Sequence, residues 1–175
     1  MGLFGNLFKK NNYIKEYANL VYLLESGADS YGMQHYSIES YETVCTKSSI
    51  SYDESFTCML AGLMYVSGIN TAVDYEKAEV YFLNAAKNGN ALAYVWLAEI
   101  EEKIHANYKK ALTYLKKGVK AGDPAAINSL GVAYATGTGV TKDIYKAKEL
   151  WMDALDKGYD AAGLNLKNHM LKGSL

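Results

Sequence analysis

The chain has 175 residues, of which 50% are hydrophobic and 21% are charged, and its formal net charge is −1. This length and composition fit one domain with a sizeable core. The balanced charge lacks the clustered positive charge of a nucleic-acid-binding protein. No segment approaches the roughly 18 consecutive apolar residues of a membrane-spanning helix, so we expect no integral membrane segment.

The N-terminus lacks a charged segment followed by a long apolar run, which predicts that no secretory signal is present. Leu3, Phe4, Leu7 and Phe8 share one helical face. For residues 2–8 we expect a short helix that packs on the domain or a frayed start, and the alternative is a weak contact with a membrane surface.

The chain has two cysteines, Cys45 and Cys58. Two are too few for a disulfide framework, and their spacing does not fit a metal site. We expect two reduced thiols in a reducing compartment, and therefore a cytoplasmic protein. Cys58 falls in an apolar helical segment, which predicts an inert, buried side chain.

Residues 1–54 are less regular than the rest of the chain. Apolar residues at helical spacing predict helices over residues 13–26 and 37–47. We expect these N-terminal helices to form a degenerate first repeat or cap, because the outer face of a terminal repeat meets water.

Residues 55–90 predict an antiparallel pair of helices. In the first helix apolar residues recur at steps of three and four, and Gly68 follows as a stop signal. Asp74 stands at the expected N-cap of the second helix. Gly89 marks the end of that helix, because glycine readily adopts the left-handed conformation.

Residues 124–160 repeat this pattern 69 positions later. Identical residues stand at equivalent positions, in the pairs Tyr65/Tyr134, Gly68/Gly137, Asp74/Asp143, Lys77/Lys146, Ala78/Ala147 and Gly89/Gly158. Such self-similarity at fixed spacing is typical of a repeat array. Gly62 and Gly131 are also equivalent, and we expect both to let the second helix approach the first closely.

Residues 91–123 predict a shortened repeat. Asn107 takes the capping position, and no glycine remains in the turn, where Ile104, His105 and Ala106 reverse the chain. Residues 161–175 predict a C-terminal cap helix and tail.

The segment 130–147 follows the pattern Leu-Gly-x-x-Tyr-x-x-Gly-x-Gly-Val-x-x-Asp-x-x-Lys-Ala, and Trp151, Ala154 and Gly158 continue it. This pattern resembles the Sel-one-like repeat family, a branch of the tetratricopeptide superfamily. The resemblance implies an all-α fold, a right-handed α-solenoid of antiparallel helix pairs whose first helices line a concave face. Members of the family are adaptors, scaffolds and, in bacteria, secretion-linked or immunity-type proteins.

Catalytic and metal chemistry find little support in the sequence. The three histidines, His35, His105 and His169, lie outside any HExxH-type arrangement. The carboxylates between residues 99 and 102 are close in sequence, but neighbours on a helix point in different directions. We expect no catalytic residue, no metal and no cofactor.

A basic run occupies the second helix of the shortened repeat. It consists of Lys109, Lys110, Lys116, Lys117 and Lys120. We expect a solvated face here, and the alternative is attraction to an acidic partner or to lipid.

Alignment of the repeats predicts the side chains that line the concave face. They are Phe56, Met59, Leu63, Val66, Leu92, Val95, Glu99, Glu102, Asn128, Val132 and Ala135. Large apolar surfaces on soluble proteins usually mark contact sites, so we expect a partner protein to bind there. The alternative is that the N-terminal helices fold over Met59 and Leu63 and bury them.

The sequence therefore predicts a non-catalytic protein–protein interaction module. Its small size and isolated array suggest a bacterial adaptor or a toxin-neutralising immunity protein linked to a secretion system, with a toxin or effector as partner. Two alternatives stay open. One is a hydrolase-like enzyme, as suggested for cysteine-rich repeat relatives, and the other is a scaffold that forms homo-oligomers.

Overall fold

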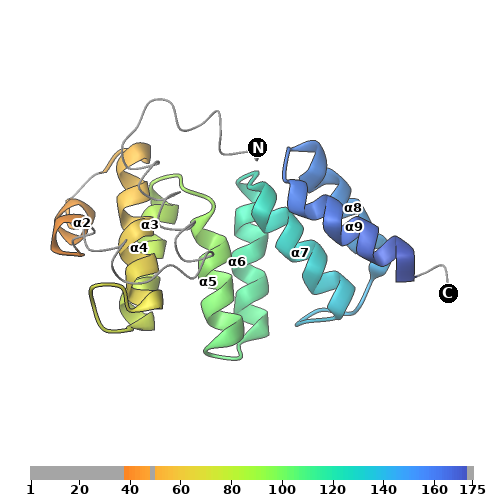
Figure 1. Ribbon diagram of the computed structural model, residues 1–175, viewed down its shortest axis with the longest axis horizontal. Helices are drawn as coiled ribbons and strands as arrows, with labels where there is room; N and C mark the ends of the chain where they lie inside the picture. The colour runs from red at the N-terminus through yellow and green to blue at the C-terminus, as the bar shows by residue number, and fades with distance from the viewer. Residues whose placement is uncertain (1–37, 48–49, 173–175) are drawn as a thin grey trace. The chain divides into compact units, whose positions relative to one another are not determined.

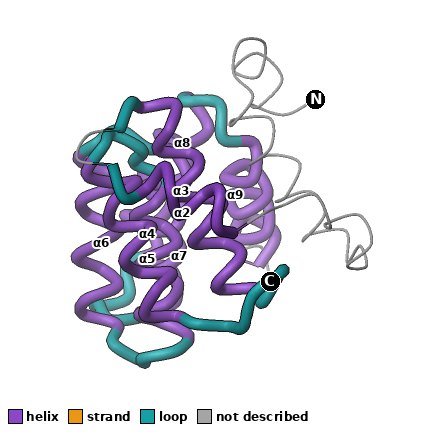
Figure 2. Tube along the Cα trace, turned by 90° about the vertical axis from the view of Figure 1, so that its left-hand side faces the viewer, coloured by secondary structure: helices purple, strands orange, loops and turns teal. Residues whose placement is uncertain are grey.

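The computed structural model describes residues 38–47 and 50–172 (Figure 1). Within these ranges all regular secondary structure is helical, in eight helices joined by short loops (Figure 2). The helices are α2 (Ile38–Cys45), α3 (Tyr52–Ser67), α4 (Tyr75–Lys87), α5 (Ala93–Lys103), α6 (Tyr108–Lys120), α7 (Pro124–Thr136), α8 (Ile144–Asp156) and α9 (Asp160–Lys172). Consecutive helices pack as pairs, so the all-α prediction is confirmed.

The predicted helix over 37–47 is present as α2, and the predicted C-terminal cap helix is present as α9. The helices predicted over residues 2–8 and 13–26 lie outside the described residues. The chain divides between Ala93 and Tyr94 into two compact units. We call the described residues up to Ala93 the N-terminal unit and those from Tyr94 onward the C-terminal unit.

In the N-terminal unit, α3 packs against both α2 and α4. Every residue from Ser55 to Tyr65 is buried. A helix that is apolar on all sides is stable only where protein surrounds it, because no face can be left to water at low cost. The whole middle of α3 is therefore core rather than one face of an amphipathic helix.

The two cysteines join α2 to α3. Cys45 ends α2, Cys58 lies in the middle of α3, and the two form a disulfide with their Cα atoms 5.6 Å apart. This spacing is ordinary for a disulfide. The prediction of two reduced thiols is wrong, because packing of α2 on α3 brings together cysteines that are 13 positions apart in sequence.

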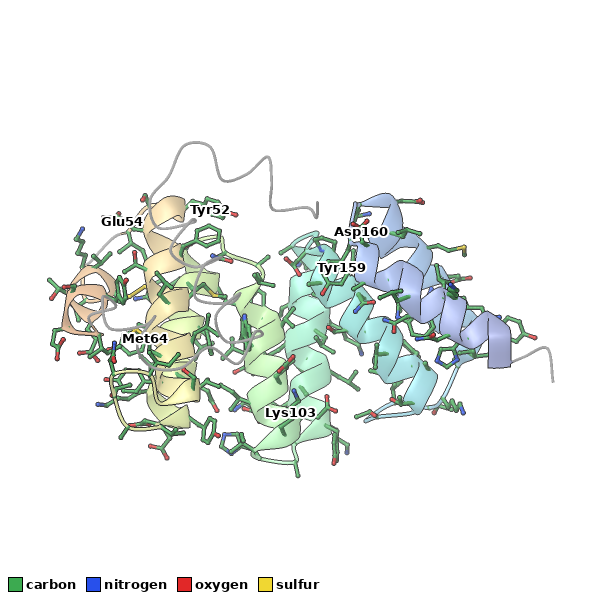
Figure 3. The ribbon with its side chains drawn as sticks, in the orientation of Figure 1. Tyr52, Glu54, Met64, Lys103, Tyr159 and Asp160 are labelled. Atoms are coloured by element: carbon green, nitrogen blue, oxygen red, sulfur yellow. A yellow bond between two sulfur atoms is a disulfide. The ribbon has the colours of Figure 1, made fainter. Side chains whose placement is uncertain are left out.

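In the C-terminal unit, α7 contacts α6, α8 and α9, and α8 contacts α9. Helix α9 begins at Asp160, directly after Tyr159 (Figure 3). The core of these helices is built around Trp151 and Ile127 with a group of small residues. The small side chains at these positions leave room for the bulky indole of Trp151 between the helices.

Helix ends follow the predicted local signals. Asp74, Asn107 and Asp143 each accept a hydrogen bond from the backbone N–H three residues later, as N-cap residues do. Gly68 and Gly137 end α3 and α7 in the left-handed conformation. At the start of α3, Ser51 and Glu54 form a reciprocal capping box, with Glu54 labelled in Figure 3.

The shortened repeat turns without glycine, as predicted. Ala106 takes a positive φ of 51° between α5 and α6. A non-glycine residue in this region costs roughly 1–2 kcal/mol. The N–H of Asn107 donates to the carbonyl of Glu101 over 2.7 Å, which closes the turn.

Candidate partner-binding surface

The two clear repeats share one way of packing their helices. A side chain added at Gly62 would place its Cβ 2.5 Å from the ring of Phe82, and one at Gly131 would lie 2.6 Å from Nε1 of Trp151. Glycine is therefore needed at both positions, because the aromatic ring of the second helix occupies the space that a side chain would take. This confirms the predicted close approach of the two helices in each pair. The glycine marks the side of α3 or α7 that faces its partner helix, so the opposite side faces away from that helix.

The turns that follow these helices are equivalent as well. The N–H of Asp74 donates to the carbonyl of Tyr65 over 3.0 Å, and the N–H of Asp143 donates to Tyr134 over 2.9 Å. Residues 69 positions apart can therefore be compared directly, side chain by side chain.

In the N-terminal unit the predicted contact side chains are closed off. Phe56, Met59 and Leu63 have exposed fractions of 6%, 0% and 1%. We correct their assignment to an open surface, because α3 is enclosed over its whole middle. Val66 and Leu92 are half-buried.

In the C-terminal unit much of the predicted surface is accessible. Glu102 is exposed, and Val95 and Glu99 on the same helix are half-buried. On α7, Val132 is 39% exposed. Ala135 is buried at 4%, so it is also removed from the contact set.

Asn128 has a structural task on α7. Its carbonyl accepts a hydrogen bond from Nε1 of Trp151 over 3.2 Å, and its side-chain Oδ1 accepts one from Nδ2 of Asn165 over 2.8 Å. The residue thus connects α7 to α8 and to α9. A partner that contacts Asn128 would compete with the second of these bonds.

The carboxylates of α5 fall into two kinds. Glu99 forms an exposed ion pair with Lys103, 2.9 Å apart, one helical turn away. Glu101 is buried at 1% and pairs with Lys110 of α6. Glu101 therefore stabilises the pairing of α5 with α6, whereas Glu102 gives the accessible face a negative charge that no ion pair of the described residues offsets.

Sequence reasoning missed a polar cluster between α2, α3 and α4. The hydroxyls of Tyr65 and Tyr81 both donate to Oε1 of Glu42, over 2.6 and 2.7 Å. The two rings are stacked with their centroids 5.7 Å apart. Nζ of Lys77 lies 4.9 Å from the centroid of the Tyr65 ring. The cluster binds the short helix α2 to the helix pair that follows.

The cluster perturbs the titration of its members. The hydrogen bonds from Tyr65 and Tyr81 favour the carboxylate form and lower the pKa of Glu42. The hydrogen bond to Glu42 raises the pKa of Tyr65, and burial followed by the bond to Glu42 raises the pKa of Tyr81. The hydrogen bond that Lys77 donates to Tyr65 raises the pKa of Lys77. All four groups therefore keep their usual charge states near neutral pH.

The cysteines and histidines do not form a nucleophile pair within the described residues. Cys58 has no free thiol, because it is bonded to Cys45. His105 is exposed after α5, and the ring of His169 lies 5.0 Å from that of Trp151. His35 lies outside the described residues. Among the described helices, none combines the length and apolar character needed to cross a membrane.

The repeat pattern is matched by a known family model. The Sel1 repeat model matches residues 56–90, 102–123 and 124–159, which is more than half of the chain. This chain belongs to the Sel1 repeat family. The repeat boundaries predicted at residues 54, 90, 123 and 160 stay predictions. Sel1 repeats generally mediate protein interactions and are typically non-catalytic.

Two solved Sel1 repeat structures are similar to this one. A Sel1 repeat protein from Oxalobacter formigenes has a TM-score of 0.66 at 22% identity, over 74% of this chain and 51% of that chain. A protective antigen of uropathogenic Escherichia coli, displaying an SLR fold, has a TM-score of 0.65 at 26% identity, over 88% of this chain and 33% of that chain.

One similar protein comes from a plant. Over 87 residues the chain is 36% identical to the ERAD-associated E3 ubiquitin-protein ligase component HRD3B of Arabidopsis thaliana. The aligned segment covers 49% of this chain and 14% of that protein. The chain thus spans about half or less of the length of each of these three relatives. The two structural matches support the helical architecture, and the shared repeats do not define a partner.

Proposed function

We propose that this Sel1 repeat chain is a non-catalytic module that binds a partner protein through the accessible side chains of α5 and α7. One observation carries the proposal. Within the same helix-pair geometry, Val132 is 39% exposed, whereas its equivalent Leu63 is 1% exposed. The later repeat keeps an apolar side chain at the surface where the earlier repeat uses it as core.

The accessible part of the predicted contact set is therefore smaller than the sequence predicted. Within the C-terminal unit it consists of Val95, Glu99, Glu102, Asn128 and Val132, and in the N-terminal unit Val66 and Leu92 are half-buried. A partner for this surface would combine an apolar side chain for Val132 with positive charge for Glu102. Partly apolar patches with a charged rim are common in protein interfaces.

Site-specific photo-crosslinking tests this proposal. A photoreactive amino acid at Val132 or at Glu102 should give one discrete protein adduct in the native host, and the same group at exposed Met152 on α8 should not. The partner, once purified, should bind Glu102→Lys/Val132→Asp at least about tenfold more weakly. Unchanged binding by this folded variant would show that the surface is wrong.

Within this class we propose a bacterial adaptor or a toxin-neutralising immunity protein. The likeness to two bacterial Sel1-type structures supports a bacterial setting. An immunity protein should rescue cells from a toxin encoded beside it, whereas an adaptor should not. A broad hydrolase screen and sedimentation test the two rival functions, a hydrolase-like enzyme and a self-associating scaffold.

The disulfide bears on where the protein works. Disulfides persist in oxidising compartments and are rare in the cytosol. We therefore propose an oxidising compartment, such as the periplasm, in place of the cytoplasm that the sequence predicted. Acid trapping and alkylation of the protein from its host should leave both cysteines unmodified. Alkylation of both cysteines would instead indicate a reducing compartment.

A further inference from the structure

Helix α6 carries the strongest local charge in the described structure. It contains five lysines in thirteen residues and no acidic residue. All five lysines are exposed, whereas its apolar residues Leu112 and Leu115 are buried. The lysines therefore cover the solvent side of a helix whose other side is core.

Four of these lysines have no carboxylate partner in the part of the chain that the structure describes. Lys110 pairs with Glu101 of α5, but Lys109, Lys116, Lys117 and Lys120 form no ion pair there. Lysines elsewhere in the same unit do, as in Lys146 with Glu149 and Lys103 with Glu99. The positive charge of α6 is thus not neutralised by its surroundings.

The aromatic ring of Tyr114 orders part of this surface. The Nζ atoms of Lys110 and Lys117 lie 5.8 and 5.4 Å from its centroid. The ring is 8% exposed and stacks on Tyr94 of α5 with centroids 6.4 Å apart. A rigid ring that holds flexible ammonium groups lowers the entropy lost when they bind an anion.

The equivalent helices of the other repeats lack this charge. Helix α4 carries two lysines and two glutamates, and α8 carries two lysines with three acidic residues. The charge is also uneven along the chain, since residues 94–175 have twelve lysines against nine carboxylates and residues 4–93 have six against ten. The basic face is therefore particular to the shortened repeat rather than a feature of the repeat architecture.

We propose that the exposed face of α6 is a second docking surface, which binds an acidic segment of a protein. The row of lysines from Lys109 to Lys120 is about 17 Å long at 1.5 Å per residue, which suits a segment with several carboxylates along one side. This surface goes beyond the proposed function, because it does not use Glu102 or Val132.

Two other anionic partners fit the surface less well. The chain contains no arginine, so it lacks the planar guanidinium fork that suits bidentate recognition of phosphate. Helices that lie on membranes place large apolar side chains beside their lysines. The exposed apolar residue on α6 is Tyr108 alone, at 45%, among the described side chains of that helix.

The test is direct binding of a labelled helical peptide with glutamate at every third or fourth position, followed by fluorescence anisotropy at low and physiological salt. The same peptide with glutamine in place of glutamate is the ligand control. The variant Lys109→Glu/Lys116→Glu/Lys120→Glu should bind the acidic peptide at least about tenfold more weakly than the unmodified protein.

The matched control is Lys87→Glu/Lys142→Glu/Lys167→Glu. It alters three exposed lysines and changes the net charge by the same amount. It should keep binding within about threefold, and the Glu102→Lys/Val132→Asp variant should bind the peptide no more weakly than the unmodified protein. Helicity measured by circular dichroism confirms that each variant folds.

Several results would overturn the proposal. Equal losses in both triple variants would show a response to net charge alone. Tighter binding to anionic phosphatidylglycerol vesicles or to duplex DNA than to the peptide would assign the surface to another class of partner. Concentration-dependent sedimentation that only the α6 variant abolishes would identify a second copy of this chain as the occupant. Absence of peptide binding by the unmodified protein would remove the surface altogether.

Discussion

The helix pairs α3–α4 and α7–α8 have the same internal geometry but different surroundings. In each, a glycine of the first helix receives an aromatic ring of the second, Gly62 with Phe82 and Gly131 with Trp151. Yet Leu63 is 1% exposed and its equivalent Val132 is 39% exposed. The residues that the two copies share build the helix pair, and the residues that differ decide whether its outer face is core or surface.

The neighbouring helix explains much of this difference. Helix α3 is joined to α2 by the Cys45–Cys58 disulfide and by the two tyrosine hydrogen bonds to Glu42. Helix α7 contacts α9 through the hydrogen bond from Asn165 to Asn128 and through a core in which Ile127 and Ala162 take part. Asn128 stands where α3 has Met59, so a polar contact replaces an apolar one at the same position.

The strongest test of this comparison is truncation of the two equivalent side chains. Leu63→Ala should lower the free energy of unfolding by about 2–5 kcal/mol, because it leaves a cavity in a closed core. Val132→Ala should change it by no more than about 0.5 kcal/mol, as expected at the surface. Urea denaturation of both variants measures the contrast. Similar losses would mean that α7 is enclosed as α3 is.

Removal of the disulfide should loosen the N-terminal unit alone. Cys45→Ala/Cys58→Ala opens a short loop, which costs about 3 kcal/mol on the chain-entropy estimate. Hydrogen exchange should speed up in α2 and α3 and stay unchanged in α7 and α8. A phosphine reductant should have the same effect on the unmodified protein and none on the variant. Unchanged exchange in α3 would show that the disulfide does not hold it.

Substitution of the tyrosines at equivalent positions should also destabilise the protein more in the earlier repeat than in the later one. Tyr65→Phe removes a hydrogen bond to a carboxylate, and such bonds contribute about 1.5–3 kcal/mol. The hydroxyl of Tyr134 makes no hydrogen bond within the described part of the chain, so Tyr134→Phe should cost no more than about 0.5 kcal/mol. Thermal or urea unfolding of the two variants decides whether the polar cluster stabilises α2.

The same cluster predicts a pH dependence. The pKa of Glu42 lies below its ordinary value of 4.5, so near that pH the unfolded chain binds more protons than the folded one. Stability contributed by Glu42 is thus present above pH 4.5 and is lost as the pH falls below it. Glu42→Gln should flatten this acid-side loss relative to the unmodified protein. Parallel profiles would mean that other carboxylates cause it.

The repeat architecture could be predicted because its signals are local. Gly68 and Asp74 act within one turn of their own helix, and their spacing is enough to place the helix ends. The Cys45–Cys58 bond and the Tyr81–Glu42 bond join different helices across 13 and 39 positions. No local pattern indicates such contacts, because they depend on how α2 packs against α3.

The candidate surface was predicted only in part for a related reason. Alignment of repeats places Leu63 and Val132 at one position, but it assumes that every repeat has equivalent neighbours. That assumption holds for Val132 and Glu102, which are exposed, and fails for Met59 and Leu63. The run of large apolar residues in α3 was itself the signal for a core helix, since an exposed face would carry polar residues.

A more modest effect should come from exchanging the aromatic ring that the two repeats do not share. Trp151→Phe gives α8 the residue that α4 has at Phe82 and removes the hydrogen bond from Nε1 to the carbonyl of Asn128. The expected loss is about 1 kcal/mol, because a neutral hydrogen bond is lost while most of the ring is kept. Asn165→Ala, which removes the other bond to Asn128, is the control and should cost a similar amount. A loss above about 3 kcal/mol for Trp151→Phe would show that the size of the indole, rather than its hydrogen bond, holds α8 on α7, and that the two repeats are less alike than their shared glycines indicate.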